Sequence, residues 1–255
     1  MKVTQISQTI QGEGYHLGLP CILIRLACCN LTCDFCDSKW SLIGGEEKNN
    51  KDFAQEIYDL YYKDKEYEPM IMFTGGEPLL QIDDIAEFLE HFYDVSEEKN
   101  LVPTVTIESN GVLLKEIGIC KKIDILDDFG DITVTISPKL NRDFYPDASI
   151  DINSFFDEVD TNCKIYGVNH IYKFVHIKED EQRILNLVHR LDKYREDIFV
   201  MAFTPNKKSE FEEKFHKNCL DCLDFCMKYG FRYSPREHLY LFGLGKKEWD
   251  SATTN

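Results

Sequence analysis

Three cysteines close together in the chain are the residues best suited to chemistry. Cys29, Cys33 and Cys36 are separated by three and then two residues, directly after an apolar, β-branched run. Structural zinc sites and ordinary iron–sulfur clusters take four protein ligands. Three thiolates from one loop would leave a metal position open to a small molecule, as catalytic metal sites do. The spacing therefore predicts a metal centre that binds a further ligand.

A glycine pair and a carboxylate form the second candidate segment. Directly after the apolar run 70–74 come Gly75, Gly76, Glu77 and Pro78. Two glycines let the backbone approach a ligand closely, and a carboxylate can bind an ammonium group. The same residues are also typical of a strand-to-helix turn, with proline in the first helical turn. Taken alone, the segment leaves both interpretations open.

A second group of cysteines lies in the segment 207–229 and comprises Cys219, Cys222 and Cys226. These residues recur at i, i+3 and i+7 of a predicted amphipathic helix, and cysteine is among the most often buried residue types. We therefore expect them to pack in the core. A second cluster, or a metal link to the first cysteine loop, stays open as the alternative.

Apolar runs and helical patterns alternate along the chain. Six runs predict strands, at 21–26, 70–74, 104–107, 132–136, 172–177 and 198–203, and four segments predict amphipathic helices, at 52–62, 81–93, 180–194 and 207–229. The segment 140–168 is long, with a weak helical pattern at 151–159. This alternation predicts βα units and a parallel sheet, open or barrel-like. In such folds chemistry collects at the carboxyl ends of strands, where the cysteine loop, Gly75, Glu108 and Ser137 fall.

Composition narrows the classes of partner. The chain has 255 residues, 10 cysteines and a formal net charge of −16. So negative a surface repels phosphate backbones, which disfavours nucleic acid as a partner. The first residues carry no apolar leader, and no run approaches the roughly 18 apolar residues of a membrane span. We expect a cytoplasmic protein with reduced thiols and no membrane partner.

Together, the cysteine loop and the glycine pair resemble the radical SAM superfamily. The likeness continues in the segments 9–14 (TIQGEG), 137–139 (SPK) and 232–238 (RYSPREH), in Arg25, and in the Cys36-Asp37-Ser38 sequence. This set, spread from residue 9 to residue 238, resembles the 7-carboxy-7-deazaguanine synthase family within that superfamily. The N-terminal IQGEG sequence is the discriminating part.

The superfamily resemblance implies the fold and two cofactors. The expected fold is α/β, a partial (βα)6 radical SAM barrel with a mostly parallel six-stranded sheet and a modified helical shell. We expect one domain over 1–255, with a core of about 1–240 and a C-terminal extension at 241–255. A 4Fe–4S cluster would bind Cys29, Cys33 and Cys36, and S-adenosylmethionine would bind its open iron. The resemblance assigns the S-adenosylmethionine site to Phe35, Asp37, Gly75, Gly76, Glu77, Ser137, Pro138 and Lys139.

The narrower resemblance implies a substrate, a further metal and their residues. Arg25 and Glu108 would be catalytic, and Arg25 would also bind the substrate carboxylate, which suits a guanidinium group. Ser38 would offer a hydroxyl to Mg²⁺, a cation that prefers oxygen ligands. The family's pterin-binding positions correspond to Ile10, Gln11, Gly12, Glu13, Arg25, Thr74 and His238.

The implied reaction is a radical ring contraction that depends on S-adenosylmethionine and Mg²⁺. It converts 6-carboxy-5,6,7,8-tetrahydropterin to 7-carboxy-7-deazaguanine with loss of ammonia, a carbon–nitrogen lyase step of queuosine-type 7-deazapurine biosynthesis. A flavodoxin-type electron donor and a homodimer are implied partners. Two alternatives stay open: a radical SAM activating enzyme that makes a glycyl radical on a partner protein, and a zinc-stabilised binding module.

Three departures from the family pattern stand out. Ser38 replaces a more usual threonine, which keeps the oxygen and loses a methyl group. Cys28 occupies a position that is commonly glycine, and the additional length falls mainly in 140–168 and after residue 239. None of these changes removes a group assigned to the reaction.

Overall fold

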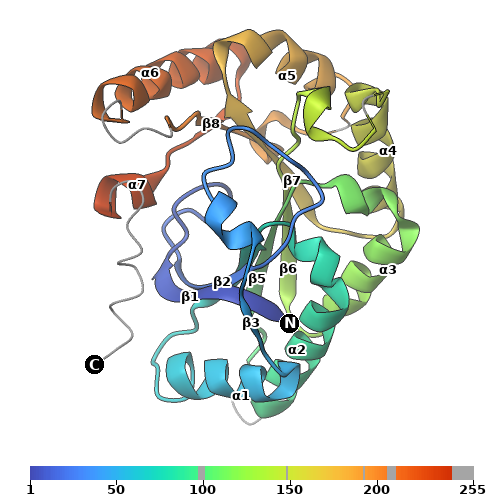
Figure 1. The fold of residues 1–255 in the computed structure, drawn as a ribbon, viewed down its shortest axis with the longest axis vertical. Helices are drawn as coiled ribbons and strands as arrows, with labels where there is room; N and C mark the ends of the chain where they lie inside the picture. Colours follow the sequence, from blue (N-terminus) through green and yellow to red (C-terminus); the bar gives the residue numbers. More distant parts are fainter. Residues whose placement is uncertain (97–100, 148, 192, 206–210, 243–255) are drawn as a thin grey trace.

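A single open sheet organises the protein. The structure, a computed structural model, describes residues 1–96, 101–147, 149–191, 193–205 and 211–242. Within these ranges the strand order is β3-β1-β2-β4-β5-β6-β7-β8-β9. The expected C-terminal extension, 241–255, lies outside the described residues from residue 243 onward. Figure 1 shows the strands inside an arc of helices that runs from α1 to α6.

Six parallel strands form the centre of the sheet, and they match the six that the sequence predicts. They are β2 (Pro20–Leu26), β4 (Met70–Gly75), β5 (Thr104–Ser109), β6 (Asp131–Ile136), β7 (His170–His176) and β8 (Ile198–Ala202). Each pairs with the next along the chain, as consecutive βα units require. The expected α/β fold with a mostly parallel sheet is confirmed.

Three further strands extend the sheet beyond the prediction. β1 (Lys2–Ile10) pairs antiparallel with β2, β3 (Glu46–Glu47) pairs antiparallel with β1, and β9 (Arg232–Ser234) pairs parallel with β8. β1 is mostly polar, so it lacks the continuous apolar run by which buried parallel strands are recognised. The described sheet thus has nine strands with β3 and β9 at its edges, which makes it a partial barrel.

Helices α1 to α6 cover the outer face of this sheet (Figure 1). The four that the sequence predicts are α1 (Asn50–Tyr61), α2 (Ile82–Ser96), α5 (Glu181–Val188) and α6 (Phe211–Tyr229). Three more are α3 (Ile117–Leu126), α4 (Ile152–Ile165) and α7 (Glu237–Phe242), of which α4 belongs to the long segment 140–168. Side-chain caps begin α1 and α4, because Asn49 and Asp151 accept backbone hydrogen bonds of 3.1 Å from residues in the first turn. None of the described helices is both long enough and apolar enough to cross a membrane.

The second cysteine group lies in the core, as its helical spacing predicts. Cys219, Cys222 and Cys226 are all buried on α6, and the thiol of Cys222 donates to the backbone carbonyl of Val200 in β8. The helix packs its apolar stripe on the sheet through these residues. The core-packing interpretation is therefore confirmed.

Alternation along the parallel strands separates a core face from an inner face. In β7, Tyr172 and Phe174 are fully buried in the hydrophobic core. Lys173 and Val175, which alternate with them along the strand, line a cavity inside the partial barrel. Because successive side chains of a strand point to opposite faces, the strand can pack a core and furnish a site at once. The polar residues described next lie on this inner face or at its rim.

Candidate active site

Two adjoining cavities lie at the carboxyl ends of the strands. The first has a volume of about 470 Å³, and its lining includes Arg25, Trp40 and His238. The second has a volume of about 520 Å³, and its lining includes the three cysteines of the loop. The residues that line both are Glu13, Asp37, Ser38, Thr74, Gly75, Glu108, Lys173, Thr204 and Arg236. The shared walls make the two cavities compartments of one site.

The cysteine loop supplies three thiols to the second cavity. Cys29, Cys33 and Cys36 all line it, and the hydroxyl of Ser38 lies 3.7 Å from Cys36 Sγ. Burial raises the pKa of Cys33 to about 11 and also raises the pKa of Cys29, whereas the charge of Lys139 lowers both. Among the described residues, no group of three or more His, Cys, Asp and Glu side chains is gathered closely enough to hold a metal ion.

The three thiols match an iron–sulfur cluster in donor type, because each thiolate would bind a different iron and the thiols need not converge on one ion. Three thiols facing one cavity are what a cluster with an open iron requires, and a bound metal deprotonates its thiols despite a raised pKa. The cavity extends beyond the thiols past Phe35, Ser137 and Lys139, whose ammonium donates to Ser137 Oγ at 3.0 Å. These three assigned positions therefore fit S-adenosylmethionine beside the cluster. Pro138, assigned to the same ligand, is not among the residues that line either cavity.

The glycine pair fits tightly against the start of the cysteine loop. The backbone N–H of Gly76 donates to the Leu26 carbonyl at 3.0 Å, and that of Glu77 donates to the Cys28 carbonyl at 2.8 Å. A Cβ on Gly76 would lie 1.6 Å from the Cys28 oxygen. Cys28 itself has a φ of 70°, in the left-handed region that favours glycine. The pair therefore sets the path of the loop as well as lining the cavity.

The Glu77 carboxylate is hydrogen-bonded within the protein. Its side chain is 0% exposed and lines neither cavity. The carboxylate instead accepts hydrogen bonds from Ser109 Oγ at 2.8 Å and from the backbone N–H groups of Asn110 and Leu79, at 2.7 and 3.1 Å. Burial raises the pKa of Glu77, and these three donors oppose the rise. Glu77 thus ties the end of β4 to the end of β5, and its assignment to the S-adenosylmethionine site stays a prediction.

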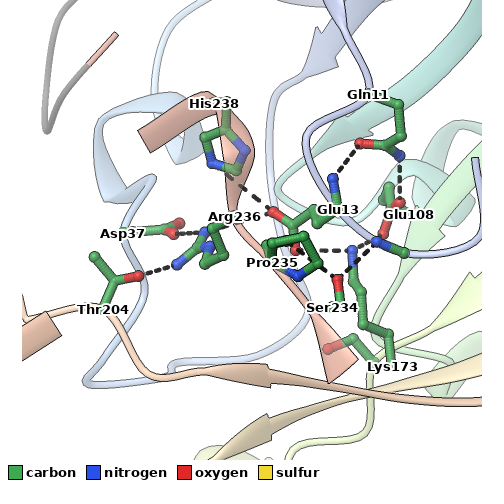
Figure 2. Close-up of polar contacts among 12 residues, drawn as sticks. Gln11, Glu13, Asp37, Glu108, Lys173, Thr204, Ser234, Pro235, Arg236 and His238 are labelled. Atoms are coloured by element: carbon green, nitrogen blue, oxygen red, sulfur yellow. Dashed lines mark hydrogen bonds and ion pairs between the residues drawn. The ribbon is translucent and has the colours of Figure 1, made fainter. Parts of the chain in front are cut away.

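Glu13 is the centre of a buried group of charges, which Figure 2 shows. Lys173 Nζ lies 3.1 Å from Glu13 Oε2, while Arg236 Nη2 and His238 Nε2 lie 3.6 and 3.9 Å from Oε1. Burial alone would raise the pKa of Glu13, but the charges of Lys173, Arg236 and His238 hold it well below its usual range. Glu13 is therefore an ionised carboxylate inside the protein.

Glu108 and Gln11 extend this network across the first cavity. Glu108 accepts from Lys173 Nζ at 2.7 Å through one oxygen and from Gln11 Nε2 at 3.1 Å through the other. The backbone N–H of Glu13 donates to Gln11 Oε1 at 3.4 Å (Figure 2). The assigned residues Gln11, Glu13 and Glu108 are thus brought together from the loop after β1 and from β5.

Arg25 enters the first cavity from β2. Its Nε donates to Gln5 Oε1 at 3.0 Å, and its guanidinium carbon lies 5.5 Å from the centre of the Trp40 ring. The other assigned residues that line this cavity are Ile10, Gly12, Thr74 and His238. His238 packs directly on Gly12, where a Cβ would lie 2.1 Å from its Nδ1. The structure therefore places a cation and a histidine on walls of the same cavity.

Sequence reasoning missed several residues of the site. Lys173 and Arg236 were given no role, and neither were Thr204 and Trp40, yet all four line the first cavity. A signal for Lys173 was present, because a charge inside an apolar run requires a partner. Arg236 offered no such signal. Its hydrogen bond to Asp37, at 2.8 Å, joins residues that are 199 positions apart in the sequence.

Comparisons with known proteins agree with this geometry. The family model described as the radical SAM superfamily matches residues 23–217. The 7-carboxy-7-deazaguanine synthase of Thermoplasma acidophilum is 39% identical over 113 residues, 44% of this chain and 48% of that protein. The chain spans about half or less of the length of the first curated relatives that it matches.

Other comparisons cover nearly the whole chain. The 7-carboxy-7-deazaguanine synthase of Hyperthermus butylicus is 28% identical over 244 residues, 94% of this chain and 92% of that protein. The crystal structure of QueE from Escherichia coli superposes with a TM-score of 0.59 at 20% identity, over 93% of this chain and 94% of that one. The second likeness shows the fold alone. The two curated relatives named above are 7-carboxy-7-deazaguanine synthases, and the chain belongs to the radical SAM superfamily.

Proposed function

We propose that the protein converts 6-carboxy-5,6,7,8-tetrahydropterin to 7-carboxy-7-deazaguanine, with loss of ammonia. The observation that carries this proposal is the shared wall between the two cavities. The cavity with three thiols adjoins one that holds Arg25, an ionised Glu13 and Glu108. When bound, the cluster and S-adenosylmethionine supply the radical chemistry, and the protein supplies binding, orientation and exclusion of water.

The first cavity suits an anionic, flat heterocycle with N–H groups. The guanidinium of Arg25 matches a carboxylate, and the half-exposed Trp40 indole beside it offers an apolar surface. Glu13 and Glu108 are acceptors for N–H groups of the pterin ring, while Gln11 offers an amide. Thr74 and the Gly12 backbone complete the lining. These roles are supported by the residues' chemistry and by the likeness to the curated relatives.

Residues for the cofactors lie on the other side of the shared wall. Cys29, Cys33 and Cys36 would hold the 4Fe–4S cluster, and Lys139 would offer a cation to S-adenosylmethionine. Ser38 lines both cavities, so its hydroxyl is available for Mg²⁺ next to the substrate carboxylate. Asp37 already pairs with Arg236, which makes it the less available oxygen donor of the two.

Anaerobic reconstitution followed by turnover tests the proposal. Purified protein would be loaded with iron and sulfide, assayed for about four irons, and incubated with the pterin, S-adenosylmethionine, Mg²⁺ and a reductant. The expected products by mass spectrometry are 7-carboxy-7-deazaguanine and 5′-deoxyadenosine. A loaded protein that forms 5′-deoxyadenosine but leaves the pterin unchanged would exclude this substrate. Colourless protein with stoichiometric zinc would exclude the radical chemistry.

The Mg²⁺ assignment has its own pair of variants. Ser38→Ala removes the hydroxyl, so we expect Mg²⁺ to stop stimulating the reaction while the iron content stays unchanged. Ser38→Thr keeps the oxygen, and its Mg²⁺ response should match that of the natural chain. Equal stimulation in both variants would remove Ser38 from the metal site.

The resemblance of the sequence to the family implies three further proposals. We propose a flavodoxin-type electron donor, a homodimer, and a single cytoplasmic domain over 1–255. Size-exclusion chromatography with light scattering tests the dimer, and replacement of the chemical reductant by reduced flavodoxin tests the donor. Formation of a glycyl radical on a partner protein is the alternative activity, and no contact described above favours it.

A further inference from the structure

We propose that Lys173 is a positioning residue whose ammonium group holds Glu13 and Glu108 as a pair of ionised carboxylates facing the substrate cavity. The chemical class that such a pair selects is a heterocycle with adjacent N–H donors. In naming that ligand, the inference rests on the proposed function. The arrangement of the three charges stands on the geometry alone.

Lys173 reaches the site because of its place in β7. It is 4% exposed and lies between Tyr172 and Phe174, whose rings pack in the core on the opposite face of the strand. Glu108 comes from β5, and Glu13 comes from the loop after β1. The ammonium is therefore a common point for three parts of the chain that are distant in sequence (Figure 2).

The ammonium lies within bonding distance of both carboxylates. Lys173 Nζ is 2.7 Å from Glu108 Oε2 and 3.1 Å from Glu13 Oε2. Burial lowers the pKa of Lys173, but the two carboxylates outweigh it and raise the pKa above its ordinary value. Two carboxylates that approach one point without a cation would share a proton, because like charges in a buried site cannot both ionise. The positive charge of Lys173 offsets the repulsion between the two carboxylates.

Other charged groups around the pair do not duplicate this role. Arg236 and His238 face Glu13 from the C-terminal segment, and Arg236 divides its charge between Glu13 and Asp37 of the cysteine loop. On the other side of the pair lies Cys21 of β2. Burial, and to a smaller extent the charge of Glu108, raises the pKa of the Cys21 thiol to about 12. Among the described side chains, Lys173 alone is ion-paired with both Glu13 and Glu108.

The ionisation state of the pair decides what it can recognise. A carboxylate accepts hydrogen bonds only, whereas a protonated carboxyl group also donates one. Two ionised acceptors match a heterocycle edge that presents N–H groups, and a shared proton would place a donor against that edge. Leaving such a polar contact unmatched in a buried site weakens binding strongly.

Lys173→Met, Lys173→Arg and the control Lys193→Met test the charge. Lys193 is half-buried and donates to the His170 carbonyl, away from both cavities. In the natural chain Glu13 stays ionised, so its contribution to stability is constant between about pH 8 and pH 5. Lys173→Met should raise the pKa of Glu13, and proton uptake then favours the folded state as the pH falls.

The denaturation midpoint gives a readout that needs no cofactor and no substrate. The deficit of Lys173→Met relative to the natural chain should shrink as the pH falls from about 8 to about 5. For Lys173→Arg and Lys193→Met the deficit should be independent of pH. A pH-independent deficit in Lys173→Met would overturn the proposal, because it would show a purely structural lysine.

Turnover of the loaded enzyme gives the second readout. Lys173→Met should raise the KM for the pterin about tenfold or more, whereas Lys193→Met should change it less than about twofold. Lys173→Arg should restore most of the affinity. An unchanged KM in Lys173→Met would overturn the proposal. Failure of the natural chain to convert the pterin would instead count against the proposed function, and the midpoint measurement would still decide the role of Lys173.

Discussion

The guanidinium of Arg236 donates a 2.8 Å hydrogen bond from Nη2 to Asp37 Oδ2, across 199 positions of the chain. Asp37 directly follows Cys36, the last cysteine of the loop. Burial would lower the pKa of Arg236, but Glu13 and Asp37 raise it above its ordinary value. The geometry of the cysteine loop therefore depends on a residue from the C-terminal segment.

Replacement of Arg236 should loosen both the cysteine loop and Glu13. Arg236→Gln removes a cation that is 9% exposed, and half-exposed Asp37 and partly buried Glu13 lose a partner. Because water screens Asp37, we expect a loss of about 2 kcal/mol in the free energy of unfolding. Urea denaturation measures it. Arg232→Gln, an exposed change in the same segment, should cost below about 1 kcal/mol; equal losses would argue against the pairing described here.

Gly76 should tolerate no side chain. In Gly76→Ala the new Cβ would lie 1.6 Å from the Cys28 oxygen, so the backbone of the cysteine loop must move. We expect a loss of about 3 kcal/mol or more in stability and a fall in bound iron after reconstitution. Gly118→Ala is the matched control, because a Cβ there meets nothing within 4 Å and Gly118 lies in α3. It should stabilise by up to about 1 kcal/mol with iron unchanged.

Replacement of Cys28 by glycine should stabilise the protein. Its φ of 70° is unfavourable for a residue with a Cβ, and its side chain is exposed. Cys28→Gly should therefore raise the free energy of unfolding by about 0.5–1 kcal/mol and leave the iron content unchanged. Cys28→Ala keeps the Cβ and should give no gain. Loss of iron in either variant would show that the Cys28 thiol takes part in the metal centre.

His238 should make the protein sensitive to acid. Burial lowers its pKa from 6.5 to about 4, with Glu13 opposing and Arg236 adding to the effect. As the pH falls through this range the unfolded chain takes up the proton first, so the folded state loses stability between about pH 6.5 and pH 4. The expected loss is about 3 kcal/mol.

The pH dependence of denaturation in two variants separates His238 from other histidines. His238→Gln should remove this part of the acid loss. His189→Gln, a change at an exposed position, should keep the slope of the natural chain. If His238→Gln retains the full slope, the histidine is protonated in the folded protein and the buried contact with Gly12 is not maintained in solution.

The contiguous parts of the site could be predicted from the sequence. The three cysteines, the glycine pair and the 9–14 segment are local patterns, and the six central strands are continuous apolar runs. The sequence did not predict β1, because a mostly polar strand lacks such a run. Its place beside β2 is fixed only by pairing in the folded sheet.

Contacts between residues that are distant in the sequence could not be predicted from the sequence. The bond between Arg236 and Asp37 joins distant segments, and nothing local to either residue specifies it. Glu77 is a second residue whose contacts could not be predicted from the sequence. Its position after a strand suggested a ligand, but its hydrogen bonds to Ser109 and Asn110 exist only because β4 and β5 are neighbours.

The contacts between residues 11–14 and 234–238 have a consequence for synthesis. The Glu237 N–H donates to the Gly12 carbonyl at 2.9 Å, the Gly14 N–H donates to Ser234 Oγ at 2.8 Å, and His238 covers Gly12. One wall of the pocket is thus assembled from an early and a late stretch of the polypeptide. A nascent chain cannot close this wall until residue 238 has left the ribosome, so tight capture of a substrate must follow translation of nearly everything described here.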